Sequence, residues 1–446
     1  MGKTVNMTAG PIKKQLIFYA LPLILGNLCQ QLYNMADSFV VGRFVGQDAF
    51  AALGVASTVM NLFIFILSGL NVGASLLMAR CWGARDEKGL RNQLWTALWW
   101  GGAITAVFTI GGLFFLEDIL RLLNTPEVLM RDAQSYLGII VSGLALTFLY
   151  NLFSALFRAL GNSKTALGFL IFSTLGNVAL DVLFVAVFKM GVVGAAWATV
   201  LAQGASVALC YGYCRKSYPF VRIRRADMRL DRRVLRCTAQ YGMVAALQQS
   251  SLYFGKTLVQ GIVNGYGTEV ISAYAASTRI ESFLLATAAS GEDAIGTFIS
   301  QNTGAGNEKR VRDGFLSGLE LLLIYGAAAT ALLYAFCPWL LGIFLTDARA
   351  IELGVAYFRT IGPFYLLAYL CNALVGYFRG TGRMMIPFVG TTLQISLRVL
   401  FSALLMPALS LAGVSWAVTI GWLFLATFHL LNYRRVSRAP NTRTPA

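Results

Sequence analysis

Polar side chains recur at helical spacing inside two long apolar segments in the first half of the sequence. Gln30, Asn34 and Asp37 follow one another at intervals of four and three residues, which places all three on one face of a helix. Asn177 and Asp181 are likewise one helical turn apart. A charged side chain at the centre of a bilayer costs about 2.5–3.5 kcal/mol on insertion scales, so each of these acids needs a reason to be there.

The oxygen-bearing residues of this half are expected at one depth in the membrane. The segments of Asp37 and Asp181 run outward and carry these acids near their ends, whereas the next segment runs inward and carries Thr199 near its start. Hard cations prefer oxygen ligands, and two carboxylates in a low dielectric tend to share a proton. We therefore predict a cation or proton site formed by Asp37, Asn177, Asp181 and Thr199. A structural role stays open, with Asp37 hydrated at the outer interface and Asn177 joining two helices, a bond worth roughly 0.6 kcal/mol.

The second half carries a different set of charges inside its apolar segments. They are Lys256, Arg279, Glu281, Glu292, Asp293 and Arg398. An internal repeat aligns Lys256 with Asp37 and Arg398 with Asp181, so bases replace acids at these positions. Two interpretations stay open. Either the acids neutralise the bases within the second half, or Glu292 and Asp293 contact a cationic substrate from the inner side.

Long apolar segments must position these residues. The chain has 446 residues, of which 57% are hydrophobic and only 13% are charged, whereas soluble domains carry about 25% charge. Hydropathy predicts twelve membrane-spanning helices. We expect them near residues 15–40, 49–78, 92–116, 133–157, 165–187, 191–214, 237–263, 270–300, 314–336, 354–377, 385–405 and 410–432.

The two halves of the chain repeat each other. Residues 53–58 return as 274–278, and 157–161, which include an arginine after a phenylalanine, return as 378–382. A duplicated membrane bundle is typical of secondary transporters. Each half has an even number of predicted spans, so we expect two pseudo-symmetric six-helix bundles as a parallel repeat around a central cavity.

The net charge of +16 is explained by membrane topology. Most Lys and Arg residues, Arg379 among them, fall on the side of the N-terminus, which places both termini in the cytoplasm and makes nucleic-acid binding unnecessary. We divide the chain into an N-lobe at 1–214, a basic cytoplasmic linker at 215–236 and a C-lobe at 237–446. Contact between this linker and anionic lipid is compatible with its charge.

Proline and glycine mark positions where helices bend or approach closely. Pro22 removes a backbone hydrogen bond in the first segment and is a candidate hinge, although membrane helices tolerate proline for other reasons too. Gly69-xxx-Gly73 and Gly261-xxx-Gly265 both permit close helix packing.

The sequence gives little support for a metal site or for covalent catalysis. Cys210 and Cys214 stand at i and i+4 without other plausible metal ligands nearby, and the only histidine, His429, lies in the last segment. We expect no enzyme, no cofactor and no metal beyond a possible Na⁺ at the cation site.

At these residues the chain closely resembles the multidrug and toxic compound extrusion (MATE) family of efflux transporters, over essentially its whole length. The resemblance is carried by Pro22, Ala36-Asp37-Ser38, Gly83-Ala84, Asn177-xxx-Asp181, Thr199 and Gln301-Asn302-xxx-Gly304-Ala305-Gly306. It implies twelve helices in two lobes with a V-shaped central cavity, and export of cationic amphiphilic compounds against inward flow of H⁺ or Na⁺.

The family's pattern also implies roles for individual residues. Asp37, Asn177, Asp181 and Thr199 match its N-lobe cation site. Three further residues are assigned to the N-lobe substrate cavity: Gln30, Asn34 and Asn151. Glu292-Asp293 departs from the pattern, in which small or apolar residues are usual.

We therefore expect alternating access driven by charge. An ionised Asp37/Asp181 pair binds a lipophilic cation or favours the state that accepts it, and H⁺ or Na⁺ from outside neutralises the pair and releases the drug. The alternative is a flippase for a lipid-linked or anionic amphiphilic metabolite, whose headgroup Lys256, Arg279 and Arg398 would hold. We expect a monomer in the bacterial cytoplasmic membrane, whose partners are small cationic molecules and the lipid bilayer.

Overall fold

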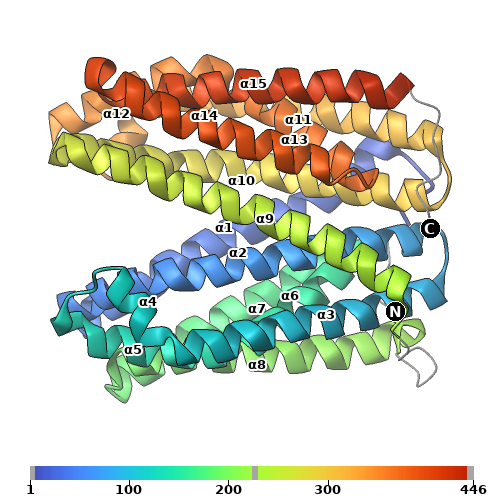
Figure 1. The fold of residues 1–446 in the computed structure, drawn as a ribbon, viewed down its shortest axis with the longest axis horizontal. Helices are drawn as coiled ribbons and strands as arrows, with labels where there is room; N and C mark the ends of the chain where they lie inside the picture. The colour runs from blue at the N-terminus through green and yellow to red at the C-terminus, as the bar shows by residue number, and fades with distance from the viewer. Residues whose placement is uncertain (1–5, 223–229, 439–446) are drawn as a thin grey trace. The chain divides into compact units, whose positions relative to one another are not determined.

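The computed structural model describes residues 6–222 and 230–438, where helices are the regular elements (Figure 1). The first half contains α1 (Ile12–Phe44), α2 (Gln47–Gly83), α3 (Glu87–Phe114), α4 (Leu116–Leu122), α5 (Glu127–Ser142), α6 (Leu144–Ala159), α7 (Ser163–Asp181), the π-helix η1 (Val182–Val187), α8 (Gly191–Ser217) and the 3₁₀ turn η2 (Pro219–Val221). The second half contains α9 (Arg232–Val263), η4 (Asn264–Tyr266), α10 (Thr268–Gly304), α11 (Glu308–Gly342), α12 (Ala348–Ile361), η5 (Gly362–Phe364), α13 (Tyr365–Gly380), α14 (Met385–Leu409) and α15 (Leu411–Arg438).

Along the described chain these helices make twelve long segments. α5 and α6 form one segment bent by 47°, α12 and α13 form another through η5, and α7 continues into η1. The short α4 is an addition to the predicted set. The twelve helices predicted from hydropathy are confirmed, because each predicted range overlaps one of these segments.

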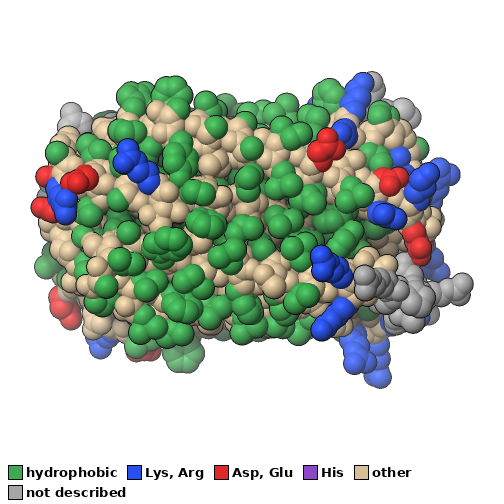
Figure 2. All heavy atoms as spheres, turned by 90° about the horizontal axis from the view of Figure 1, so that it is seen from above, with side chains coloured by type: hydrophobic (Ala, Val, Ile, Leu, Met, Phe, Trp, Pro, Cys, Tyr) green, Lys and Arg blue, Asp and Glu red, His purple; other side chains and the backbone are tan. Residues whose placement is uncertain are grey.

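Eight of the described helices are long and apolar enough to cross a membrane, or nine if the bent pair α5–α6 counts as one span. α10 is not among them, because it carries Arg279, Glu281, Glu292 and Asp293 within its length. Hydrophobic side chains cover the middle of the face shown in Figure 2, and most of its Lys and Arg lie towards the two ends of that face. The charges inside α10 are therefore exceptions that need partners or a function.

The chain divides into two compact units. Unit 1 comprises residues 1–7 and 21–246, and unit 2 comprises residues 8–20 and 247–446. Each unit has its own hydrophobic core, around Phe148 and Phe157 in unit 1 and around Tyr357 and Phe358 in unit 2. Two of the three boundaries fall inside a helix, so α1 changes unit at Leu21 and α9 changes unit at Leu247.

Two glycines of α2 bring this helix against the unit 1 part of α9. A Cβ at Gly69 would lie 2.3 Å from the Ala246 Cα, and one at Gly73 would lie 2.6 Å from the Gly242 nitrogen. A side chain at either position would collide with backbone, so only glycine fits. In contrast, a Cβ at Gly261 or Gly265 would meet no atom of the described residues within 4 Å. Of the two glycine pairs predicted to pack helices, the first does so here.

The sequence repeat corresponds to a repeated turn. Two residues beyond the ends of α2 and α10 stands a residue with positive φ, Arg85 at 57° and Gly306 at 69°, and the residue after it caps the next helix. The Asp86 side chain accepts from Gly89 N at 2.8 Å, and the Asn307 side chain accepts from Arg310 N at 3.1 Å. These caps satisfy amides at the start of α3 and α11, so the two units begin their third segments in the same way.

Candidate cation site

The end of α7 brings two polar side chains into the interior of unit 1. Asn177 and Asp181 are one turn apart, and their exposed fractions are 3% and 1%. α7 then continues as the π-helix η1, and such turns occur frequently at functional sites. α8 returns close alongside η1 because Gly194 has no side chain. A Cβ at this position would lie 3.1 Å from the Phe184 Cβ. This approach of η1 and α8 sets Thr199 opposite Asn177.

The Asn177 amide joins Asp181 to α8. With its nitrogen facing the acid, Nδ2 donates to the Asp181 Oδ2 at 3.0 Å, while Oδ1 accepts from the Thr199 backbone N at 3.1 Å. This orientation follows from the hydrogen-bond network, because the opposite one sets the amide oxygen against the carboxylate. The Thr199 hydroxyl donates to the Ala195 carbonyl at 3.2 Å. The amide thus holds the Asp181 carboxylate and bonds at the same time to α8.

The structure therefore brings together three of the four residues predicted for the cation site. The fourth, Asp37, lies on the helical backbone of α1, but its side chain lies outside the described residues, as does that of Asn34. Gln30 is exposed on α1, and Pro22 is buried just after this helix passes from unit 2 into unit 1. Whether Asp37 completes the site stays a prediction.

Asn151, predicted near the substrate cavity, lies half-buried on α6. Its Nδ2 donates to the Thr147 carbonyl one turn earlier, at 2.9 Å, and the Thr147 hydroxyl donates to the Gln203 Oε1 of α8. The amide oxygen of Gln203 is a feature that the sequence analysis did not name. Helical periodicity alone does not identify which polar residue of α8 faces α6.

A buried acid surrounded by tyrosines occupies unit 2. Glu281 accepts at Oε2 from the Tyr357 hydroxyl at 3.4 Å and at Oε1 from the Tyr365 hydroxyl at 3.3 Å. The half-buried Arg398 donates from Nη2 to the Tyr274 hydroxyl at 3.4 Å. Among the described residues, no ion pair within 4.0 Å joins Glu281 to a base. Glu281 and Arg398 are thus linked through tyrosine hydroxyls and attract each other at longer range, without the direct pairing that neutralisation would need.

Two more of the predicted unit 2 charges are exposed. They are Lys256 of α9 and Arg279 of α10. Lys256 lies within electrostatic range of both Arg398 and Glu281. This group therefore holds more positive than negative charge.

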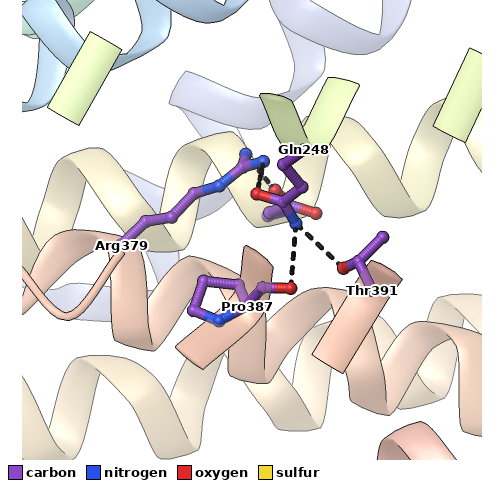
Figure 3. Close-up of polar contacts among 5 residues, drawn as sticks. Gln248, Arg379, Pro387 and Thr391 are labelled. Carbon is purple, nitrogen blue, oxygen red and sulfur yellow. Dashed lines mark hydrogen bonds and ion pairs between the residues drawn. The ribbon is translucent and has the colours of Figure 1, made fainter. Parts of the chain in front are cut away.

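A second buried network includes Glu292 of α10, and Figure 3 shows its contacts at Arg379, Gln248 and Thr391. Its carboxylate forms an ion pair with Arg379 of α13, whose Nη2 donates to the Gln248 Oε1 of α9 at 2.9 Å. Gln248 in turn donates from Nε2 to the Thr391 hydroxyl at 2.9 Å. The sequence analysis placed Arg379 among the charges of the inner side and did not name it as the partner of Glu292. The partner of Glu292 is thus none of the three bases considered from sequence.

Comparisons with known proteins agree with this fold. A family model described as MatE matches residues 22–183 and 245–404. The probable multidrug resistance protein YpnP of Bacillus subtilis is 31% identical over 437 residues, covering 97% of each chain. A second B. subtilis protein, the probable multidrug resistance protein YoeA, is 28% identical, covering 84% of this chain and 83% of its own. A solved structure of a MOP superfamily transporter from Pyrococcus furiosus superposes with a TM-score of 0.90 at 22% identity, covering 98% of both chains.

Long apolar helices in two units, with buried polar residues inside each, form a helical membrane-protein fold of two lobes. The chain belongs to the MatE family, the multidrug and toxic compound extrusion transporters. This confirms the resemblance on which the sequence analysis relied.

Proposed function

We propose that this protein exports cationic amphiphilic compounds in exchange for H⁺ or Na⁺, and that the acidic site of unit 1 binds the coupling ion. The observation that carries the proposal is the buried Asp181, held by Asn177, which is itself bonded to Thr199 on the next helix. The names of the two B. subtilis relatives, both multidrug resistance proteins, support small-molecule drugs as the substrates.

The physical basis is charge neutralisation in a low dielectric. A buried carboxylate attracts either a coupling ion or a cationic substrate, and the two compete for it. An ion that enters from outside and neutralises Asp181 and Asp37 weakens the hold on the substrate. Coupling requires that the ion bind the inward-open and outward-open states with different affinity, since equal affinity shifts no population. Pro22 is proposed as the hinge of α1.

The proposal includes the division of the chain into lobes and its orientation in the membrane. The residues 1–214 act as the N-lobe and 237–446 as the C-lobe, joined by the basic linker 215–236 on the cytoplasmic side. Both termini lie in the cytoplasm, and the protein works as a monomer in the bacterial cytoplasmic membrane. The distribution of Lys and Arg supports this orientation.

The test is drug export by carboxyl-to-amide variants. Asp37→Asn and Asp181→Asn should each abolish drug resistance and dye efflux while the protein still reaches the membrane. Asp118→Asn, at an exposed acid of α4, is the matched control and should export normally. Imposing pH and Na⁺ gradients separately on purified protein in liposomes identifies the coupling ion. Unchanged export by both site variants would remove the carboxylate mechanism.

The bases of unit 2 favour a second candidate, the export of an anionic or lipid-linked amphiphile. Lys256 and Arg279 are exposed and Arg398 is half-buried, whereas Glu281 is the acid bonded nearby. Cysteines placed beside Lys256 and Arg398 should then be labelled by water-soluble thiol reagents and protected by an anionic amphiphile. Protection by cationic drugs alone supports the first candidate.

A further inference from the structure

The network around Glu292 joins four helices of unit 2 through one guanidinium (Figure 3). Arg379 of α13 reaches the Glu292 carboxylate of α10 and the Gln248 amide of α9, and that amide donates to the Thr391 hydroxyl and Pro387 carbonyl of α14. The side chains of Arg379 and Glu292 are only 9% and 12% exposed. A buried ion pair with these bonds is costly to break by removal of one partner.

The acids here outnumber the nearby base. Asp293 follows Glu292 directly in α10, is half-buried, and lies close enough to repel its charge. Within the described residues, Arg379 is the one cation within 4.0 Å of either carboxylate. Two carboxylates and one guanidinium sum to a single negative charge. Such a group becomes neutral when one of the carboxylates binds a proton.

Other titratable groups on the packed helices do not supply the missing charge. Tyr19 of α1 donates to the Thr297 hydroxyl further along α10, and Tyr369 of α13 bonds to Thr287. His429 of α15 is buried against the rings of Phe378 and Phe428, and no ion pair among the described residues joins it to either acid. Gln248 and Thr391, which face the network from α9 and α14, carry no charge.

We propose that Glu292 is a second proton-binding site, located in unit 2 and separate from the site at Asp181. A proton from water adds to one oxygen of the Glu292 carboxylate and gives a neutral carboxylic acid, and no other bond is made or broken. Arg379 keeps its charge and then balances Asp293. The proton returns to water by the reverse step.

Protonation of Glu292 changes the contacts of α9. The guanidinium that holds Glu292 also holds Gln248, and Gln248 is the second residue of α9 beyond its passage into unit 2 at Leu247. When Arg379 turns from Glu292 towards Asp293, its bond to Gln248 lengthens or breaks. The unit 2 part of α9 then loses its bonded contact with α13.

The charge count gives the experiment. The full-length protein in detergent is held at alkaline pH in a weak buffer and then brought to mildly acid pH. A pH indicator measures how many protons each protein takes up. Glu292→Gln should lower uptake by about one proton per protein, since one titrating carboxyl is lost. Asp293→Asn should also lower it by about one, although Glu292 remains, because the remaining pair is already neutral. Glu320→Gln, at an exposed acid paired with Lys13, is the control and should leave uptake unchanged.

Two further measurements complete the test. Hydrogen exchange in α9 after Leu247 should become faster at mildly acid pH in the wild type, and should lose this pH dependence in Asp293→Asn. Asp181→Asn should lower proton uptake independently, so the effects of Asp181→Asn and Glu292→Gln should add. Wild-type uptake in Glu292→Gln or in Asp293→Asn overturns the proposal. The proposal is also overturned if Na⁺ displaces a proton from the wild type but not from Glu292→Gln, because Glu292 is then part of a sodium site.

Discussion

Alanine substitutions at two glycines are predicted to change the free energy of unfolding in opposite directions, because only one of them lies in the contact between α2 and α9. Gly69→Ala places a Cβ 2.3 Å from the Ala246 Cα, and backbone on both sides of the contact prevents a local adjustment. Overpacking of this kind typically costs about 1–3 kcal/mol. Gly261→Ala is the matched control in α9, where the added Cβ meets nothing within 4 Å of the described residues. Alanine there should stabilise by about 0.5–1 kcal/mol, because glycine is entropically costly in a helix.

Thermal unfolding of the purified variants in detergent measures both effects. At about 2–4 °C per kcal/mol for a unit of this size, the midpoint should fall by roughly 2–12 °C for Gly69→Ala. It should rise by roughly 1–4 °C for Gly261→Ala on the same scale. Intrinsic tryptophan fluorescence and circular dichroism should give the same order. Equal shifts of the two variants in one direction would refute the argument that backbone contact at Gly69 decides the outcome.

Three further predictions concern turns and buried bonds. Asp86→Ala and Asn307→Ala should each lower the free energy of unfolding by about 1 kcal/mol through loss of a helix cap, measured by thermal or denaturant unfolding, and the double variant should show the sum. Gly306→Ala should lower it by about 1–2 kcal/mol in the same measurement, because its φ of 69° is unfavourable for alanine. Tyr365→Phe removes a bond to the buried Glu281 and should destabilise unit 2 by about 1.5–3 kcal/mol, with an unchanged midpoint contradicting a bonded role.

Much of the fold is predictable from sequence because its cause is local. A helix that crosses a bilayer needs about twenty apolar residues, so length and hydropathy identify the segments. The tight turn between η1 and α8 makes neighbouring antiparallel helices, which is why Asn177, Asp181 and Thr199 meet as predicted. Bends such as that between α5 and α6 are harder to predict, because they change direction without interrupting the apolar run.

The partners of the unit 2 charges depend on contacts between residues far apart in the chain. Glu292 and Arg379 are separated by 87 positions, and Gln248 and Arg379 by 131. Spacing within one helix fixes which face a side chain occupies, but not which residue of another helix lies opposite. The repeat gives a partial signal, since Arg379 corresponds to Arg158, yet it does not indicate that Arg379 pairs with Glu292 of another helix.

The two units share features of their backbone but differ in their buried polar side chains. The capped turns after α2 and α10 recur in both units, although the residue with positive φ is Arg85 in one and Gly306 in the other. The buried acid does not recur. The neutral amide of Asn71 stands where the repeat places Glu292 and donates to the Leu67 carbonyl, and Arg158 donates to Ser154 of its own helix. Backbone geometry is therefore shared by both units, whereas each unit holds a different set of buried charges. If Asp181 and Glu292 bind ions as proposed above, this duplicated scaffold has two binding places whose affinities are set by different neighbouring residues.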